Sequence, residues 1–459
     1  MVLIEETPDA AERIRLRHVA DQRLASGMHI ARIDWSADRL AAERLRRLRM
    51  MIRVATERSP WHRARLAGVD PDKVTEADLA GLPVMTKEDV MADFDRIVTD
   101  PRVTLAGVEA HLASLTDRPV HLLDRYQAVA SGGSTGVRGV FLYDWDAWVT
   151  NYLGWFRYLL RDLGGGPFSL AIVAAGKPTH LSRALLQTFS DPEAITFNSV
   201  PITLPLEQIV ARLNELNPDA ILGYPSALVQ LVEAARSGEL RITPRAIVTG
   251  GEPLLPETRE SAEGTFGVQV QNWWLSSEGG PMGIGCGHGP GLHLSDDLLI
   301  IEPVDAENRP VPAGTRSAKV LLTSLYNPAL PLIRYELTDE ITVLDELCPC
   351  GSAHRLIEDP YGRHDDSFRY GEILVHPHVF RSVLGSQSAI LEYQVHQTAN
   401  GAHILIRGHE GAQTLGELRR GLEQLGVRHP ELSIINVEAI ERQETGKIRR
   451  FIPLKGTHF

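Results

Sequence analysis

Short apolar runs alternate along the chain with longer stretches whose apolar residues recur at helical spacing. Residues 170–173 and 246–248 are continuous apolar runs of strand length, and 299–301 is a similar run. Residues 38–65 instead repeat apolar positions every three or four residues, which is the spacing of a helix with one buried face. No repeat period or low-complexity segment interrupts this alternation. The pattern therefore predicts an α/β fold whose larger part is a layered body of strands and helices.

The pattern changes after Gly362. The remainder of the chain predicts the order strand, helix, hairpin, helix and strand, with Asn400 and Gly401 as the turn between strands 391–397 and 403–406. Residues 362–366 are polar and lack the periodicity of a helix or a strand, which is typical of linkers. We therefore predict a large layered α/β N-terminal domain, 1–361, and a small α+β C-terminal domain, 362–459.

Composition and charge narrow the classes of function. The chain has 459 residues, of which 43% are hydrophobic, so it can bury a large core. Its formal net charge is -12 and its Lys and Arg residues are dispersed, which argues against a nucleic-acid partner. The N-terminus lacks a basic region followed by an apolar one, and no apolar stretch approaches about 18 residues. We therefore expect no membrane partner and a cytoplasmic location.

A glycine- and hydroxyl-rich segment, SGGSTGVRG, occupies residues 131–139 between two apolar runs. Glycines let a backbone fold closely around phosphate oxygens, and hydroxyl groups add hydrogen-bond donors. The Walker A spacing of nucleotide hydrolases is absent. On composition alone, an ordinary turn remains the alternative to phosphate binding. The candidate phosphate-binding residues are Ser131, Gly132, Gly133, Ser134, Thr135 and Gly136.

Further motifs follow in order along the chain: GYPS at 223–226, TGGEP at 249–253, WLSSEGG at 274–280, TD at 338–339, GRHD at 362–365 and TGK at 445–447. In this order they resemble the adenylate-forming superfamily of acyl-CoA synthetases, luciferases and peptide-synthetase adenylation domains. Within it, LPVMTK at 82–87, CPCG at 348–351 and GKIRR at 446–450 make the chain most similar to the phenylacetate-CoA ligase family. The resemblance implies an enzyme that activates a carboxylic acid with ATP as an acyl adenylate and transfers the acyl group to coenzyme A, releasing AMP and pyrophosphate. The acid is expected to be aromatic.

The resemblance also implies a role for each matching residue. Glu278 would hold Mg²⁺, which prefers oxygen ligands. Trp274 stands where the family usually has tyrosine and would flank the adenine with its apolar face. Asp339 and Arg363 would bind the ribose as acceptor and donor. The nucleotide site would also include Gly250, Gly251, Glu252 and Ser277, and the acyl group would lie beside Tyr224, Gly279 and Gly280.

Lys447 is the candidate catalytic residue of the first half-reaction. A flexible ammonium between a carboxylate and the α-phosphate of ATP offsets the repulsion of two anions. In this superfamily the small domain is mobile and swings between an adenylating and a thioester-forming orientation, and Asp365 matches the hinge. For an isolated lysine or linker aspartate, a solvated residue would be the default interpretation. The GKIRR context near the end of the chain favours the catalytic role of Lys447.

The three cysteines, Cys286, Cys348 and Cys350, lie in two loops marked by Gly and Pro. They are too few for a disulfide framework in a chain of this length. Three thiolates and one imidazole would make a closed tetrahedral site for a structural Zn²⁺ ion, with His293 as the fourth ligand and His288 as its competitor. The Cys-x-Cys spacing departs from the common zinc knuckle, so buried unreactive cysteines remain the alternative.

Several alternatives stay open. Where the superfamily's phosphate loop usually ends in Pro-Lys, this chain has Arg138 and Gly139. The acyl group could pass to an amine or a carrier protein instead of coenzyme A, and a non-catalytic nucleotide-binding homologue is a further alternative. The aromatic stretch 146–160 would line a pocket for an aromatic acid or belong to the core, and the core is preferred for at least three of its aromatic residues. A monomer or a homodimer is expected.

Overall fold

The computed structural model describes most of the chain between residues 9 and 454. Outside the description are residues 1–8, 117, 132–138, 165–166, 175–177, 290, 361, 364–366, 376, 385–386, 388, 444–447 and 455–459, together with the side chains at 362, 363, 374, 378, 381 and 382. None of the described helices is long and apolar enough to cross a membrane.

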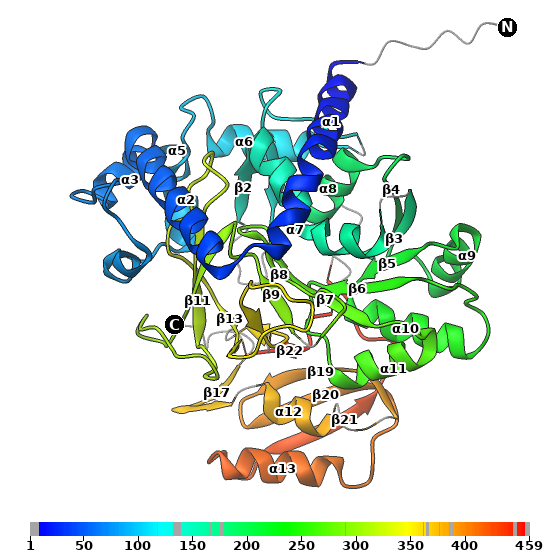
Figure 1. The fold of residues 1–459 in the computed structure, drawn as a ribbon. Coiled ribbons are helices and arrows are strands. Elements are labelled where there is room, and N and C mark those ends of the chain that lie inside the picture. Colours follow the sequence, from blue (N-terminus) through cyan, green and yellow to red (C-terminus); the bar gives the residue numbers. More distant parts are fainter. Residues whose placement is uncertain are drawn as a thin grey trace, which may run out of the picture.

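A nine-stranded mixed sheet lies at the centre of the large part (Figure 1), in the order β14-β15-β9-β8-β7-β6-β5-β3-β4. Its parallel strands are β3 (Phe168–Ala174), β4 (Ile195–Pro201), β5 (Ala220–Gly223), β6 (Ala246–Gly250) and β7 (Val270–Ser276). Its antiparallel strands are β8 (Gly280–Ile284), β9 (Leu292–Leu294), β14 (Val343–Leu344) and β15 (Leu356–Ile357). The apolar runs predicted as strands are β3 and β6, which are almost wholly buried, as expected for a parallel sheet covered on both faces.

Helices connect the parallel strands. In chain order they are α8 (Leu181–Phe189), α9 (Leu206–Leu216), α10 (Pro225–Arg236) and α11 (Pro256–Phe266). Such crossovers are required because a short turn cannot join parallel strands. The predicted α/β class of the large part is therefore confirmed. Helix α7 (Trp145–Leu163) precedes the sheet and packs against the N-terminal helix α1 (Ala10–Ala31).

The stretch predicted as helical at 38–65 forms two helices, α2 (Ala37–Arg58) and α3 (Pro60–Arg65). Ser59 separates them, because its hydroxyl accepts a hydrogen bond from the His62 backbone N–H at 3.3 Å and Pro60 occupies the first position of α3. The other elements of the large part are η1 (Arg32–Asp34), η2 (Glu76–Gly81), α4 (Lys87–Ala92), α5 (Phe94–Ile97), α6 (Leu105–Ser114), β1 (Gln127–Ala130), β2 (Val140–Tyr143), β10 (Leu299–Val304), β11 (Lys319–Ser324), β12 (Tyr335–Leu337), β13 (Asp339–Glu340) and β16 (Gly362–Arg363).

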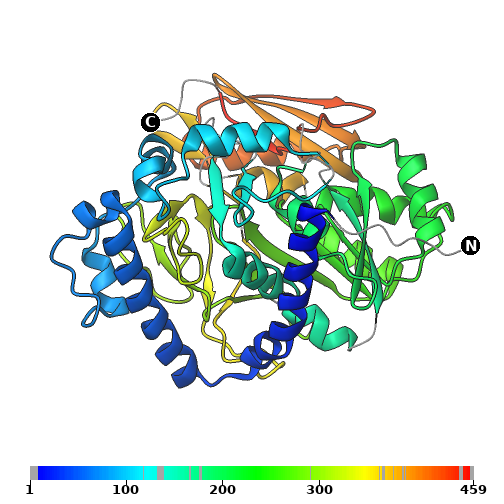
Figure 2. The ribbon, with the colours of Figure 1, turned by 90° about the horizontal axis from the view of Figure 1, so that it is seen from above.

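The C-terminal segment, residues 367–454, has a sheet and an apolar core of its own. Its four-stranded sheet has the order β21-β20-β19-β22, and the elements are β17 (Phe368–Tyr370), β18 (Ile373–Val375), α12 (His378–Leu384), β19 (Ile390–Thr398), β20 (Gly401–Gly408), α13 (Thr414–Gln424), β21 (Glu431–Asn436) and β22 (Phe451–Ile452). Leu255 of the large part joins this core. In both overall views the orange-to-red elements gather on one side of the molecule (Figures 1 and 2).

The hairpin of the C-terminal segment differs by one residue from its prediction. Thr398 pairs with Gly401, so the turn residues are Ala399 and Asn400, and Gly401 is already in β20. A side chain at Gly401 would collide with the backbone of β21, because a Cβ would lie 2.0 Å from the Glu431 carbonyl oxygen. The glycine therefore serves the close approach of β21 rather than the turn.

Candidate active site

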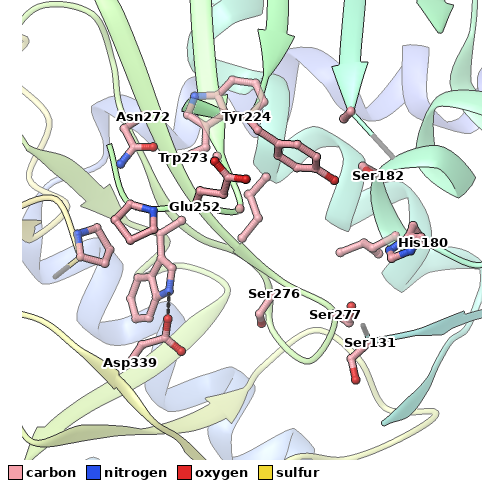
Figure 3. A pocket seen from close by; sticks show the side chains of 18 of the residues that line it. Ser131, His180, Ser182, Tyr224, Glu252, Asn272, Trp273, Ser276, Ser277 and Asp339 are labelled. Carbon is pink, nitrogen blue, oxygen red and sulfur yellow. Dashed lines mark hydrogen bonds between the residues drawn. The ribbon is translucent and has the colours of Figure 1, made fainter. Parts of the chain in front are cut away.

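A cavity of about 310 Å³ opens at the carboxyl ends of the parallel strands (Figure 3). Its wall includes Ala174, Gly223, Gly250 and Ser276, the last residues of β3, β5, β6 and β7. This edge of an open α/β sheet is the usual place for a ligand, because loops and helix N-termini converge there. Residues 448–451 form another part of the wall, so the C-terminal segment closes one side of the cavity.

The predicted adenine and ribose residues lie together at this cavity. The indole Nε1 of Trp274 donates a hydrogen bond of 3.2 Å to Oδ1 of Asp339, shown by the dashed line in Figure 3. Asp339 pairs directly with Arg363 across the short ladder of β13 and β16. The backbone therefore places the two predicted ribose residues opposite each other, while the Arg363 side chain lies outside the description.

The turn after β6 carries three of the predicted nucleotide residues, which all line the cavity. A Cβ on Gly250 would lie 2.8 Å from the Trp273 carbonyl oxygen, and Gly251 has a φ of 77°, so this turn needs glycine at both positions. The carboxylate of Glu252 accepts hydrogen bonds from the backbone N–H and hydroxyl of Ser226, both at 3.1 Å. Glu252 therefore fixes this turn to the start of α10. Tyr224, the predicted acyl-site residue that caps this helix, also lines the cavity.

The turn after β7 places Ser277 and Glu278 on the cavity wall. The Ser277 carbonyl oxygen accepts a hydrogen bond of 2.8 Å from the Tyr143 hydroxyl, which holds the turn in place. Glu278 is only 5% exposed, and the ammonium of Lys87 lies 3.8 Å from its carboxylate. Burial of a carboxylate is costly without a cation, so Lys87 compensates the charge of Glu278 in this arrangement.

Gly279 and Gly280 were predicted beside the acyl group, but the described cavity wall does not include them. Gly280 has a φ of 69°, and a Cβ there would lie 2.4 Å from the Tyr326 hydroxyl. That hydroxyl donates a hydrogen bond of 3.0 Å to the Gly279 carbonyl oxygen. In this structure Gly280 lets the turn pack against Tyr326, and Gly279 lets it pack against Leu322 and Met282.

Of the predicted phosphate-binding residues, Ser131 alone lies in the described part of the chain. Ser131 lines the cavity, and its hydroxyl accepts a hydrogen bond of 2.9 Å from the Gly139 N–H. The predicted residues outside the described part of the chain are Gly132, Gly133, Ser134, Thr135, Gly136, Asp365 and Lys447. Ile448, directly after Lys447, lines the cavity, so the chain passes beside the site at that point.

The cavity wall also contains residues for which no role was predicted. Lys87 ends the LPVMTK motif, which carried the family resemblance but no chemistry until the fold brought it to Glu278. His180 and Ser182 lie on the Tyr224 side of the cavity, and Asn272 lies on the other side (Figure 3). Among the described residues, the remaining cations on the wall are Arg449 and Arg450. Lys87 and the Arg-Arg pair after Lys447 each had a sequence signal through their places in the LPVMTK and GKIRR motifs, whereas His180, Ser182 and Asn272 had none.

Helix α7 resolves the interpretation of the aromatic stretch at 146–160. Its aromatic residues Trp148, Tyr152, Trp155, Phe156 and Tyr158 are all at most 2% exposed. Of these, Trp155 alone is among the described residues of the cavity wall, where Trp273 and Ile172 accompany it. The preference for the core is therefore confirmed for four of the five, and α7 contributes one aromatic side chain to an apolar part of the site.

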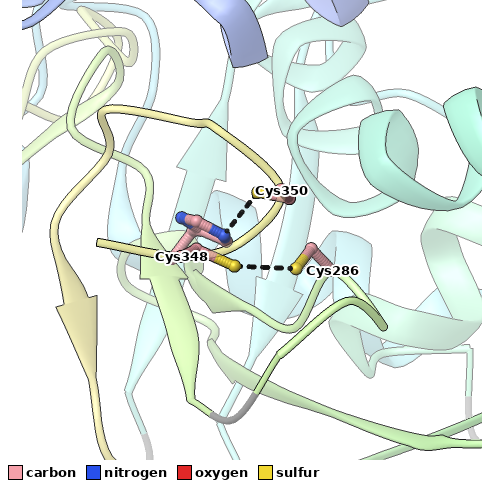
Figure 4. A group of neighbouring side chains, drawn as sticks. Cys286, Cys348 and Cys350 are labelled. Carbon is pink, nitrogen blue, oxygen red and sulfur yellow. Dashed lines mark hydrogen bonds between the residues drawn. The ribbon is translucent and has the colours of Figure 1, made fainter. Parts of the chain in front are cut away.

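A second cluster lies away from this cavity. The thiols of Cys286 and Cys348 are 3.5 Å apart, and the Cys350 sulfur lies 3.3 Å from Nε2 of His293 (Figure 4). These four ligand atoms lie within 4.8 Å of one another. His288, the competing ligand, is about half exposed on its side chain, and its Nδ1 lies 2.8 Å from the Cys286 carbonyl oxygen. The fold thus brings His293 rather than His288 to the three thiols.

Comparisons with known proteins agree with this geometry. No family model matches the chain. The phenylacetate-coenzyme A ligase of Thermus thermophilus is 26% identical over 428 residues, covering 88% of this chain and 86% of that protein. A solved 2-hydroxyisobutyryl-CoA ligase with 2-HIB-AMP in the postadenylation state has a TM-score of 0.73 at 20% identity, covering 92% of this chain and 91% of that chain. In its thioesterification state, with 2-HIB-AMP and CoA, its TM-score is 0.61 at 20% identity and the same coverage.

The fold, the cavity at the sheet edge and these similarities define a protein of the adenylate-forming superfamily. Within that superfamily the chain is similar to phenylacetate-CoA ligases over most of its length, as its sequence motifs predicted.

Proposed function

We propose that the chain is an AMP-forming acid–thiol ligase that converts a carboxylic acid, ATP and coenzyme A into an acyl-CoA, AMP and pyrophosphate. One observation carries the proposal: Trp274, Asp339, Glu278 and Lys87 meet residues 448–451 in a single cavity. In the first step a carboxylate oxygen of the acid attacks the α-phosphorus of ATP and pyrophosphate leaves. In the second step the thiolate of coenzyme A attacks the acyl carbonyl carbon and AMP leaves with the electron pair of the broken C–O bond.

The nucleoside would bind at the Trp274 end of the cavity. The indole gives an apolar face for the adenine, and its hydrogen bond of 3.2 Å orients the carboxylate of Asp339. That carboxylate can accept hydrogen bonds from both ribose hydroxyls. Such bonds are strong because the acceptor is charged. Arg363 would contact the same sugar from the opposing strand.

The phosphates would bind between Ser131 and Lys87. Residues 132–136 would cradle the β- and γ-phosphates with backbone N–H groups, and Lys87 supplies a cation that the usual Pro-Lys end of the phosphate loop would otherwise provide. Glu278 is a buried carboxylate on the cavity wall, and as such it suits Mg²⁺. Bound Mg²⁺ would neutralise phosphate charge there.

The acid would bind at the opposite end, and Lys447 would bridge it to the α-phosphate. The wall there includes Trp155, Trp273 and Ile172, with Tyr224 beside them, which suits an aromatic or other apolar acid. Ile448, the residue that follows Lys447 in the sequence, lies on the cavity wall. Residues 1–361 and 362–459 would act as two domains that turn about Asp365 between the half-reactions.

The cluster of Cys286, His293, Cys348 and Cys350 would hold a structural Zn²⁺. Three sulfurs and one imidazole nitrogen are the donor set of closed zinc sites, and the four ligand atoms already lie within 4.8 Å of one another. The His293 Nδ1 lies 3.3 Å from the His354 carbonyl oxygen, which orients Nε2 toward the thiols. Zinc would tie the loop before β9 to the loop before β15 and take no part in the chemistry.

The experiment that tests this function measures pyrophosphate exchange and AMP release with a panel of aromatic and aliphatic acids, with and without coenzyme A. AMP release that requires an acid and rises with coenzyme A would support the ligase. Acid-dependent pyrophosphate exchange without a response to coenzyme A would instead support transfer to an amine or a carrier protein. No exchange with any acid would contradict the proposal and favour a non-catalytic nucleotide-binding protein.

A further inference from the structure

A buried carboxylate in the C-terminal segment is held between two guanidinium groups. Glu392 on β19 is 2% exposed and accepts hydrogen bonds from Arg407 at 2.8 Å and Arg442 at 3.2 Å. All three residues belong to the C-terminal segment, so this triad remains complete in whatever direction the segment turns. The two arginines are thereby held in fixed positions before they contact anything else.

Each arginine uses one further nitrogen to contact α10 of the large part. Arg407 Nη1 donates to Glu233 at 3.0 Å, and Arg442 Nη1 donates to the hydroxyl of Ser226 at 2.8 Å. The side chain of Arg407 is 20% exposed, that of Arg442 is 17% exposed, and Ser226 is fully buried. The contact between Arg442 and Ser226 is therefore largely shielded from water, and the contact between Arg407 and Glu233, which is 30% exposed, is partly shielded. Such shielding strengthens the contacts relative to surface pairs.

A third contact lies beside the candidate catalytic lysine. The backbone N–H of Ile448 donates to Glu252 of the large part at 2.8 Å, and Glu252 also binds Ser226. On the other side, the carbonyl oxygens of Arg449 and Arg450 accept hydrogen bonds from Gln394 and Val395 of β19. The chain after residue 447 is thus fixed to both parts of the molecule, but the contact with Glu252 exists only when the two parts are oriented as they are here.

We propose that these groups form an orientation-specific latch that positions Lys447 for adenylation. The latch consists of Ser226, Glu233 and Glu252 on the large part and of Glu392, Arg407, Arg442 and the Ile448 N–H on the C-terminal segment. The proposal rests on the proposed function, because Lys447 and the two half-reactions come from there. In the latch, Arg407, Arg442 and Glu233 are positioning residues that act in the first half-reaction alone.

The composition of the latch explains how it can both hold and release. Its Glu392 triad stays satisfied after rotation, so only the contacts with Ser226, Glu233 and Glu252 are exchanged for water. Release therefore leaves Glu392 paired and avoids the high cost of an unpaired buried charge. The overall arrangement is also more similar to the postadenylation state of the 2-hydroxyisobutyryl-CoA ligase than to its thioesterification state, as the two TM-scores show.

The test measures the two half-reactions separately in Glu233→Gln, Arg442→Gln and a control, Arg420→Gln, which changes an exposed arginine on α13. Pyrophosphate exchange with phenylacetate reports adenylation, and thioester formation from added phenylacetyl adenylate and coenzyme A reports the second step. We expect exchange to fall about fivefold in Glu233→Gln and about tenfold in Arg442→Gln, because each loses a charge-assisted contact. The second step should stay within about twofold of wild type, and Arg442→Lys should recover part of the exchange.

Hydrogen–deuterium exchange at the Ile448 amide gives a readout that needs no turnover. The latch predicts faster exchange of this amide in Glu233→Gln and Arg442→Gln than in the wild type and in Arg420→Gln, with an unchanged melting temperature in Glu233→Gln, which leaves the Glu392 triad intact. Equal losses in both half-reactions, or unchanged amide exchange in both variants, would overturn the latch. A wild type without pyrophosphate exchange for any acid of the panel would overturn the proposed function instead, and amide exchange would then decide whether these contacts hold the orientation.

Discussion

Lys87 provides the sharpest test of the phosphate site, because its role was inferred from its position in the structure and was not predicted from the sequence. Its ammonium lies 3.8 Å from the Glu278 carboxylate, and the two side chains are 14% and 4% exposed. Lys87→Met keeps the length and apolar stem of the side chain and removes only the charge. We expect this variant to fold and to lose most of its capacity for adenylation.

The expected fall in pyrophosphate exchange follows from the electrostatic effect of one cation at a short distance. At 3.8 Å the attraction between Lys87 and Glu278 is about 4 kcal/mol in an effective dielectric of about 20, before desolvation is subtracted. A cation at a similar distance from the developing charge of pyrophosphate is worth about as much as one donor of an oxyanion hole, roughly a 100-fold effect on rate. Pyrophosphate exchange should therefore fall about 100-fold in Lys87→Met and recover substantially in Lys87→Arg, which keeps the charge.

The assay is acid-dependent pyrophosphate exchange at saturating acid, with ATP varied, and the melting temperature of each variant as the check on folding. A loss in the maximal rate that exceeds the change in the KM for ATP would place the role of Lys87 in the transition state. Exchange in Lys87→Met at the level of wild type would refute the assignment, because a cation on the cavity wall near Glu278 would then contribute nothing to phosphate chemistry.

Three further predictions concern other parts of the molecule. Asp339→Ala should raise the KM for ATP about tenfold in pyrophosphate exchange, whereas Asp345→Ala, which changes an exposed residue, should not; equal effects would contradict a ribose contact. The purified protein should contain about one zinc ion per chain by elemental analysis, and Cys348→Ser should lower both the metal content and the melting temperature; metal-free protein with an unchanged melting temperature would contradict the zinc site. Burial lowers the pKa of His62 to about 4, so the unfolded chain takes up a proton below about pH 6.5 while the folded chain does not, and stability falls as the pH falls toward 4. Between pH 7 and pH 5, His62→Gln should lose about 2 kcal/mol less unfolding free energy than wild type in urea titrations; equal losses would contradict this.

The fold was predictable where the apolar pattern decides it. Continuous apolar runs gave β3 and β6, because a strand covered on both faces must be apolar throughout. The break at Ser59 was harder to predict, since the apolar spacing continues through it and only the cap and Pro60 end one helix and begin the next. The hairpin turn was misplaced by one residue because Gly401 is required by the approach of β21, a contact distant in sequence.

The site was predictable only in part, for a similar reason. Trp274 and Asp339 carry motifs of their own, and the fold does bring them into contact. Lys87 and His180 come from segments far from those motifs, so only tertiary structure places them at the cavity. The partners of Glu252 could not be predicted either, because its hydrogen bond to Ile448 joins two parts of the chain that are 196 residues apart in sequence.

The central claim is that this chain adenylates a carboxylic acid with the help of Lys447, and pyrophosphate exchange in wild type and Lys447→Ala tests it most directly. The account predicts acid-dependent exchange in the wild type that falls at least about 100-fold in Lys447→Ala, while thioester formation from added acyl adenylate continues. Acid-dependent exchange that is unchanged in Lys447→Ala would contradict the catalytic role of this lysine, and a wild type without exchange for any acid would contradict adenylation itself.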